Sequence, residues 1–325
     1  MLGPAGMFAN INEVVCHLNL AEKNQYNFAI NWKESPYKDD FVEGDPWTYF
    51  FENCFEEAEP PNASEVLPYV GDSSDKVLNI MRPRVYNHFG RGPMLLPSDR
   101  PLARRLIETY IKPKAAIRRN IDEFEKEHFT TYVIGLHLRG PGRLHGGTRQ
   151  LKRKYVLKHG VPFGLYFGHV DAALASHPDA KIFVCSDSEM VIGECKARYG
   201  DRVLSYTATR SEFGEMHQEY RKSPEKYSGY KLGEDVIVEG YLLSKTHYFV
   251  HGNSNVSNFV LCLNPSQESK YVYAEDPHTS AVLHLLNRIL DLNLVQKAKR
   301  RWGRRIRKAL RTVKGVPNQR FAQKG

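Results

Sequence analysis

The second half of the chain alternates between short β-rich runs and helix-length segments, and this alternation restricts the fold more than any other feature. Helices are expected at Pro162–Ser176, Glu189–Tyr199, Glu234–Lys245 and Val256–Leu263. Strands are expected at Tyr132–Leu138, Lys181–Cys185, Arg202–Tyr206, Tyr248–Val250 and Lys270–Tyr273. Strands that alternate with helices in this way join into a parallel sheet covered by helices on both faces. We therefore predict an α/β fold.

The residues before Thr131 follow a less regular pattern. A glycine loop, Gly3–Asn10, leads into a helix-like segment at Ile11–Ala21, and Phe28–Trp32 is a strand candidate. The segment Leu102–Phe124 has the pattern of one long helix or two short ones. The chain of 325 residues is long enough for two ordinary domains.

Composition places the protein in a reducing compartment. The five cysteines (Cys16, Cys54, Cys185, Cys195, Cys262) are odd in number and lack CxxC spacing, which favours buried thiols over disulfides or a zinc site. We find no apolar run long enough for a transmembrane helix and no pattern typical of a signal peptide. A cytoplasmic location is the expectation.

Positive charge is concentrated at the C-terminus. Residues 297–325 carry twelve Lys or Arg and no acid, which leaves 34 basic and 37 acidic residues and a net charge of −3 for the rest. Trp302, Ile306, Leu310 and Val313 recur there at helical spacing. A basic amphipathic helix of this kind suits an anionic membrane surface, here the inner face. A solvated tail or a nucleic-acid contact are the alternatives, and we expect no nucleic acid as partner.

The strand Tyr132–Leu138 delivers two potential ligand-binding side chains to its C-terminal end. His137 and Arg139 are two residues apart and share a face of the strand, and a glycine-rich turn with Arg143 follows. Open α/β sheets bind ligands at this edge, and arginine is suited to phosphate. The segment therefore predicts an anion site, with a strand-end ion pair as the alternative.

A second polar loop follows the strand Tyr248–Val250. It includes Asn253, Ser254 and Asn255 and enters a helix, whose free N–H groups could cradle a pyrophosphate. An ordinary helix cap is the alternative for this loop and also for Asp187, which follows the strand Lys181–Cys185. Glu239 lies within the expected helix Glu234–Lys245, where a solvated helix face is the alternative.

Several motifs are missing from the sequence. It contains no GxxxxGK[ST] phosphate loop, no GxSxG nucleophile elbow and no DxD pair, so a P-loop enzyme is excluded and neither a metal nor a cofactor is implied. Without a metal, Arg139, Arg143 and a helix N-terminus would have to neutralise a leaving diphosphate.

These residues, in this order, resemble the α1,6-/α1,2-/O-fucosyltransferase superfamily, and most of all the nodulation-type and core α1,6-fucosyltransferases. The glycine loop Gly3–Gly6, the strand-end His137-Leu-Arg139, and the run from Asp235 to Asn255 carry the resemblance. It covers roughly residues 130 to 265. It implies a GT-B fold, in which two Rossmann-like domains face a cleft, and metal-independent, inverting transfer from a GDP-sugar donor.

The resemblance also implies roles for single residues. Arg139 would hold the β-phosphate, His137 would lie near the nucleoside, and Glu239 stands where those enzymes place an aspartate against guanine. Ser254 and Asn255 occupy phosphate-binding positions, together with Gly3 and Gly6 from the N-terminal domain. The family's second arginine is replaced by Gly140, for which Arg143 is a substitute, and candidates for the base are Glu13, Asp39, Asp40 and His145.

We therefore expect an acceptor-side domain over residues 1–127, a sugar-nucleotide domain over 128–280, and C-terminal helices with the basic tail over 281–325. The expected enzyme transfers a sugar, most readily L-fucose from GDP-fucose, to a glycan or lipid-linked glycan. A transferase for another nucleotide sugar in surface polysaccharide synthesis, or a non-catalytic nucleotide- or glycan-binding protein, are the alternatives.

Overall fold

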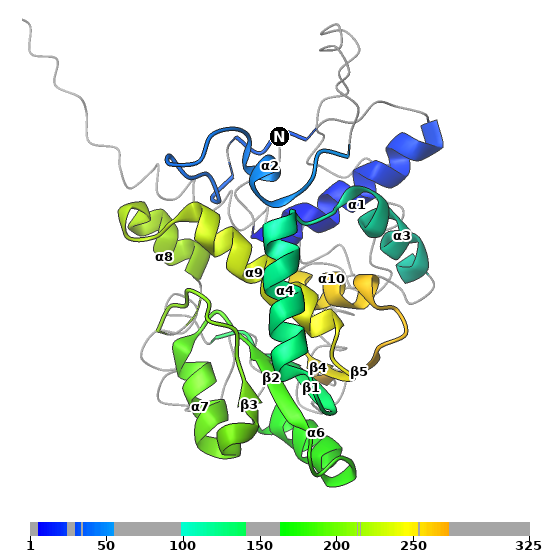
Figure 1. The fold of residues 1–325 in the computed structure, drawn as a ribbon, viewed down its shortest axis with the longest axis vertical. Helices are drawn as coiled ribbons and strands as arrows, with labels where there is room; N and C mark the ends of the chain where they lie inside the picture. Colours follow the sequence, from blue (N-terminus) through cyan, green and yellow to red (C-terminus); the bar gives the residue numbers. More distant parts are fainter. Residues whose placement is uncertain are drawn as a thin grey trace, which may run out of the picture. The chain divides into compact units, whose positions relative to one another are not determined.

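Five parallel strands form a single sheet at the centre of the described chain (Figure 1). The computed structural model describes residues 6–24, 30–33, 35–54, 99–140, 163–212, 214, 216–252 and 254–272. The strands are β1 (Val133–His137), β2 (Lys181–Cys185), β3 (Val203–Leu204), β4 (Tyr248–His251) and β5 (Glu268–Tyr271), in the order β3-β2-β1-β4-β5. All five residues of β1 are buried, which requires the continuous apolar run that the sequence shows.

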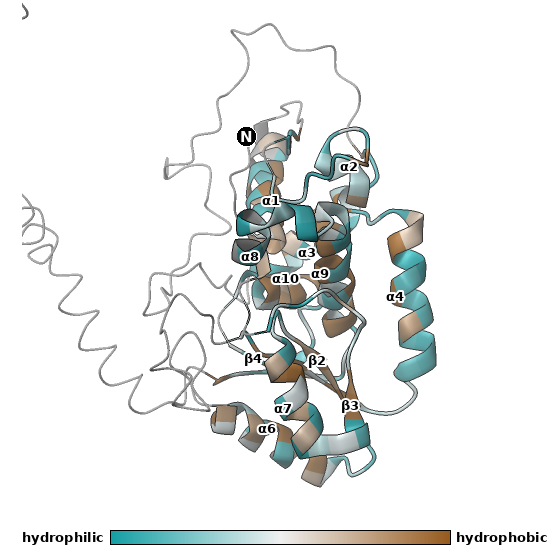
Figure 2. Cartoon of the chain, turned by 90° about the vertical axis from the view of Figure 1, so that its left-hand side faces the viewer, coloured by the Kyte–Doolittle hydropathy of each residue, from teal (hydrophilic) through white to brown (hydrophobic). Residues whose placement is uncertain are grey.

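Helices cover both faces of this sheet, as expected for an α/β fold. One face packs against α6 (Phe163–Ser176) and α7 (Glu189–Tyr199). The other packs against α9 (Gly229–Ser244) and α10 (Asn255–Leu263), together with α1 (Met7–Asn24), α3 (Arg100–Tyr110) and α4 (Ala115–His128). Figure 2 shows the strands as a hydrophobic layer between α9 and α10 on one side and α6 and α7 on the other. The shorter elements are α2 (Pro46–Phe50), α8 (Met216–Lys222) and the 3-10 turns Gly200–Arg202 and Pro224–Lys226.

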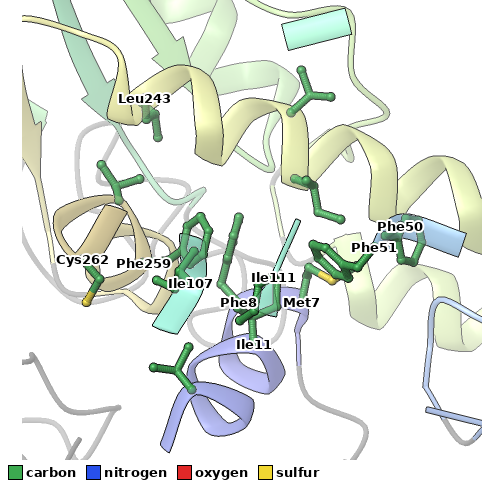
Figure 3. Close-up of a cluster of buried hydrophobic side chains, with 14 of the residues drawn as sticks. Met7, Phe8, Ile11, Phe50, Phe51, Ile107, Ile111, Leu243, Phe259 and Cys262 are labelled. Atoms are coloured by element: carbon green, nitrogen blue, oxygen red, sulfur yellow. The ribbon is translucent and has the colours of Figure 1, made fainter. Parts of the chain in front are cut away.

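The N-terminal segments approach α9 closely because glycines line one of its faces. A Cβ on Gly229 would lie 2.3 Å from the carbonyl oxygen of Lys38, and one on Gly233 would lie 2.2 Å from the ring of Phe50. Gly240 in turn faces the ring of Phe8, which packs on Phe259 of α10 with 4.4 Å between ring centroids. Figure 3 shows this cluster, to which α1, α3, α9 and α10 contribute side chains.

Several expected elements differ in extent. The segment Leu102–Phe124 forms two helices, α3 and α4, because Pro113 lies in the connection between them. The third strand is only two residues long, and the fifth is β5 (Glu268–Tyr271) instead of Lys270–Tyr273. The strand expected at Phe28–Trp32 is wrong for its described part, because the N–H of Trp32 donates to Asp45 Oδ2 at 2.8 Å and pairs with no strand.

The described residues before Val133 are helical apart from loops and one isolated bridge, Phe51 opposite Pro113. The sheet of a second Rossmann-like domain is thus not among these residues, and the domain limits at 127/128 and 280/281 stay predictions. All described residues belong to one compact unit that ends at Asp276. The basic tail at 297–325 lies outside them. No helix in the described part has both the length and the apolar character needed to span a membrane.

The glycine face of α9 generates a stability prediction. Gly233→Ala should lower the free energy of unfolding by about 1–3 kcal/mol, because the buried Phe50 ring has no room for the new methyl group. Gly193→Ala in α7 is the matched control, since nothing lies within 4 Å of its added Cβ, and it should raise stability by up to about 1 kcal/mol. Urea unfolding of both variants measures this. Equal effects would show that α9 is not tightly packed at Gly233.

Candidate functional site

The strands β1 and β4 lie side by side, yet the chain leaves them toward opposite edges of the sheet. From β1 the chain continues to β2 and β3 on one side, and from β4 to β5 on the other. In open α/β sheets, the crevice at the carboxyl ends of two such strands is where ligands bind. His137 ends β1 and His251 ends β4, and the two are directly opposite in the pairing. The predicted anion site therefore lies at the switch point of the sheet.

The side chain of His137 is buried at this switch point between β1 and β4. Its Nδ1 lies 3.3 Å from the hydroxyl of Ser254 and 3.2 Å from the hydroxyl of Ser257. Burial, with a contribution from the nearby Arg139 guanidinium, lowers the pKa of His137 to about 3. The imidazole is therefore neutral at physiological pH, and its orientation is set by two hydroxyl groups. Ser254 belongs to the polar loop that the sequence analysis selected and Ser257 to the first turn of α10, so His137 and this loop meet.

Ser254 is the N-cap of α10. Its hydroxyl accepts a hydrogen bond from the N–H of Ser257 at 2.9 Å. This is the ordinary helix cap that was the alternative for this loop. The same hydroxyl contacts His137, so the cap and the site share one side chain. Asn255 begins α10, and its carbonyl oxygen accepts a hydrogen bond from Asn12 of α1 at 3.2 Å. Through this bond α1 lies against the start of α10, while the predicted phosphate contact of Gly3 and Gly6 stays a prediction.

Arg139 follows β1 and points to the edge of the site. Its side chain is 33% exposed, and its nearest carboxylate is Asp187, with 3.8 Å between Arg139 Nε and Asp187 Oδ2. Arg139 Nε is buried and has no hydrogen-bond partner among the residues that the structure describes. An unbonded buried donor is costly, whereas hydrogen bonds to an anion are strong. The strand-end ion pair of the alternative interpretation is therefore present, with Asp187 as the carboxylate, and Arg139 Nε still has unused donor capacity at the end of β1.

Asp187 connects the ends of β1 and β2. Its Oδ1 accepts a hydrogen bond from the N–H of Gly140 at 2.8 Å. The N-cap of α7 is the next residue, Ser188, so the alternative in which Asp187 caps this helix is not the arrangement adopted. Asp187 instead fixes the backbone just after Arg139. A Cβ on Gly214, whose φ is +100°, would lie 2.9 Å from Gly140 Cα and 3.0 Å from Asp187 Oδ1, so a glycine is needed there.

Glu239 is buried beneath the sheet edge, which makes the alternative of a solvated helix face wrong. Its carboxylate pairs with the guanidinium of Arg210, and its Oε2 accepts a hydrogen bond from the thiol of Cys185 at 3.2 Å. Burial raises the pKa of Glu239 to about 7, although Arg210 acts in the opposite direction. Sequence analysis did not identify Arg210, because it lies in an irregular polar loop that carries no motif.

The remaining predicted residues are placed as follows. Gly6 precedes α1, and its carbonyl oxygen accepts from the N–H groups of Ala9 and Asn10. Asp39 is buried and accepts hydrogen bonds from the Ser228 hydroxyl at 2.6 Å and the Tyr230 N–H at 3.3 Å, so it holds the start of α9. The other base candidates described are Glu13 in α1 and the exposed Asp40. Outside the described residues lie Gly3, Arg143, His145 and Asn253.

Comparisons with known proteins give structural similarity only. No family model matches the sequence, and no curated protein matches it. The chain is similar to the NodZ fucosyltransferase from Bradyrhizobium, with 16% identity, 78% of this chain and 88% of that chain covered, and a TM-score of 0.47. NodZ alpha-1,6-fucosyltransferase soaked with GDP-fucose gives 15% identity, 79% and 89% coverage, and a TM-score of 0.48. POFUT1 in complex with GDP gives 14% identity, with 56% of this chain and 52% of that chain covered, and a TM-score of 0.34. These similarities therefore do not decide what this chain binds.

The burial of His137 predicts the effect of acid on stability. The unfolded chain binds a proton to His137 near pH 6.5, whereas the folded protein does so only near pH 3. The contribution of His137 to stability is therefore complete above pH 6.5 and is lost as the pH falls toward 3. His137→Asn should reduce the slope of the unfolding free energy against pH by about 1 kcal/mol per pH unit between pH 4 and 6.

Urea unfolding at a series of pH values measures this slope. His128→Asn is the matched control for the substitution itself, because His128 lies partly exposed at the end of α4. An unchanged slope in His137→Asn would show that His137 is protonated as easily in the folded protein as in the unfolded chain.

Proposed function

We propose that the protein is a glycosyltransferase that binds a nucleoside diphosphate sugar at the switch point between β1 and β4. The observation that carries the proposal is the buried Nε of Arg139, which has no hydrogen-bond partner in the described part of the chain and lies near a neutral His137. The hydroxyl of Ser254 contacts the same histidine and caps α10, whose N-terminus favours anions. The site thus offers a charged donor, Arg139 Nε, and a neutral one, the Ser254 hydroxyl. No carboxylate of the described residues lies within hydrogen-bond distance of Arg139 Nε.

The proposed donor is GDP-fucose, and the acceptor is a glycan or a lipid-linked glycan. The resemblance of His137-Leu-Arg139 and the Asn253–Asn255 loop to fucosyltransferase motifs supports this choice. Arg139, with Arg143 as a second cation, would hold the diphosphate, while His137, Ser254 and Asn255 would position it. A further proposal is that residues 297–325 hold the enzyme at an anionic membrane surface in the cytoplasm.

The reaction is a single displacement. The oxygen of an acceptor hydroxyl forms a bond to the anomeric carbon while the bond from that carbon to the diphosphate oxygen breaks, and the proton of the hydroxyl passes to a base. Negative charge grows on the leaving diphosphate, where Arg139 and the start of α10 would stabilise it. Attack from the face opposite the leaving group inverts the anomeric configuration. Among the base candidates, Asp39 already uses its carboxylate to hold the start of α9.

Arg139→Ala should weaken GDP binding about ten- to hundredfold, because it removes charge-assisted hydrogen bonds worth about 1.5–3 kcal/mol. Arg104→Ala is the control, since Arg104 is exposed and pairs only with Glu108 on the surface of α3. Isothermal titration calorimetry of the full chain measures both variants. Equal GDP affinities for Arg139→Ala and the wild type would contradict the proposed phosphate site.

A ligand screen tests the donor. GDP and GDP-fucose should raise the melting temperature, whereas UDP- and CMP-sugars should leave it unchanged. A shift with UDP or CMP sugars alone would replace the fucose donor by another nucleotide sugar, and no shift with any of them would overturn the proposed function. Release of GDP from GDP-fucose in the presence of glycan acceptors, lost in Arg139→Ala with the fold intact, would exclude a protein that only binds.

A further inference from the structure

We infer that Arg210 and Glu239 are positioning residues for the nucleotide site and that Glu239 does not contact the nucleotide base. This inference rests on the proposed function for its ligand, although its geometry is independent of that ligand. Both side chains are only 6% exposed, and they form a direct ion pair between the loop after β3 and helix α9. Both oxygens of the Glu239 carboxylate have partners, because Oε1 pairs with Arg210 and Oε2 accepts a hydrogen bond from the Cys185 thiol.

Arg210 uses its remaining donors to fasten the loop that carries it. Its Nε donates to the carbonyl oxygen of Ser186 at 3.1 Å, directly after β2. Its Nη1 and Nη2 donate to the carbonyl oxygens of Ala208 at 3.1 Å and Tyr206 at 2.9 Å. A planar guanidinium with several fixed donors holds such a geometry better than an ammonium group. One buried side chain thus fixes the loop to the carboxyl end of β2, where the ligand-binding edge begins.

The fastened loop in turn supports Asp187. Ser211, the next residue, donates its N–H to the carbonyl oxygen of Asp187 at 3.2 Å and its hydroxyl to the same oxygen at 3.3 Å. The N–H of Glu189 donates back to Ser211 at 2.8 Å. Gly214 then packs against Gly140 and Asp187. The loop residues from Tyr206 to Glu212, together with Gly214, therefore pack against Asp187.

Asp187 transmits this support to the candidate site. Its Oδ1 holds the N–H of Gly140, and its Oδ2 lies 3.8 Å from Arg139 Nε. The contacts therefore run from Glu239 through Arg210 and Ser211 to Asp187, and from there to Arg139. Without Arg210, the loop would lose its bonds to Glu239 of α9 and to the carbonyl oxygen of Ser186, and only the bond from the Thr209 N–H to Asp235 would still join it to α9 among those described. Arg139 would then be held less precisely against a bound diphosphate. Displacements of about 1 Å at such positions can cost about a hundredfold in function.

The test removes both charges of the pair together. Arg210→Met alone would leave a buried carboxylate without its partner, which can unfold the protein, whereas replacing both partners by apolar residues is often neutral for stability. The variant is therefore Arg210→Met/Glu239→Leu. Its matched control is Arg198→Met/Asp171→Asn, which removes an ion pair between α7 and α6 whose side chains are 47% and 44% exposed. Both are studied in the full chain.

The first measurement needs no ligand. Amide hydrogen exchange of Gly140 should become at least about tenfold faster in Arg210→Met/Glu239→Leu, because its acceptor Asp187 loses its support. Exchange in β5 should stay as in the wild type, which separates a local effect from general loss of structure. The control variant should leave Gly140 unchanged. Wild-type exchange at Gly140 in the folded double variant would overturn the inference.

The second measurement is the affinity for GDP. It should fall about tenfold or more in the double variant and by less than about twofold in the control variant. The single variant Arg210→Lys keeps the ion pair and should restore part of the affinity, which a purely structural defect would not predict. If GDP binds the wild type and the folded double variant equally, the inference is wrong. If GDP does not bind the wild type, the proposed function fails, while the exchange measurement still decides the role of Arg210.

Discussion

The pairing of β1 with both β2 and β4 is the constraint on which the rest of the structure depends. Its register places His137 opposite Cys185 on one side and His251 on the other. Residues in register on adjacent strands share one face of the sheet, so these three polar side chains form a row beneath α9 and α10. A slip by one residue would turn this row to the opposite face and bring Ile134 and Leu136 to the face beneath α9 and α10.

A buried polar row is stable only if its members have partners. Helix α9 and the start of α10 supply them to Cys185 and His137, and the chain directly after β4 supplies one to His251. Ser254 and Ser257 of α10 contact His137, Glu239 of α9 accepts from Cys185, and the Nδ1 of His251 lies 3.0 Å from the carbonyl oxygen of Gly252. Burial lowers the pKa of His251 to about 4, as it does for His137, so both rings stay neutral. The row is therefore polar but nearly uncharged, and the charges lie just beyond it, on Arg139, Asp187 and Arg210.

Periodicity was sufficient to predict the sheet and the two faces it buries, because these features depend on neighbours in the sequence. His137 and Ser254 are 117 residues apart, and they meet because both follow the general rule that the carboxyl ends of parallel strands share one edge of the sheet. The partners of Glu239 and Trp32 could not be predicted in this way. Arg210 is 29 residues from Glu239, and Asp45 is 13 residues from Trp32, and no local pattern encodes either contact. The aromatic run around Trp32 resembles a strand, yet its backbone N–H is used by a carboxylate. The short β3 has the same cause, since the residues after Leu204 are held by Arg210 instead of by a sheet neighbour.

Arg139 and Arg210 show how the same residue type acquires different roles at neighbouring strand ends. Arg210 lies behind the end of β2 and is buried, and it bonds a carboxylate and three carbonyl oxygens, so little donor capacity is left for a ligand. Arg139 follows β1 and is one-third exposed, and its Nε has no bond. Exchanging an existing bond for a new one yields little free energy, whereas satisfying an unbonded donor yields more. The difference in hydrogen-bond satisfaction, and not the charge itself, is the reason that we propose ligand binding for Arg139 and support for Arg210.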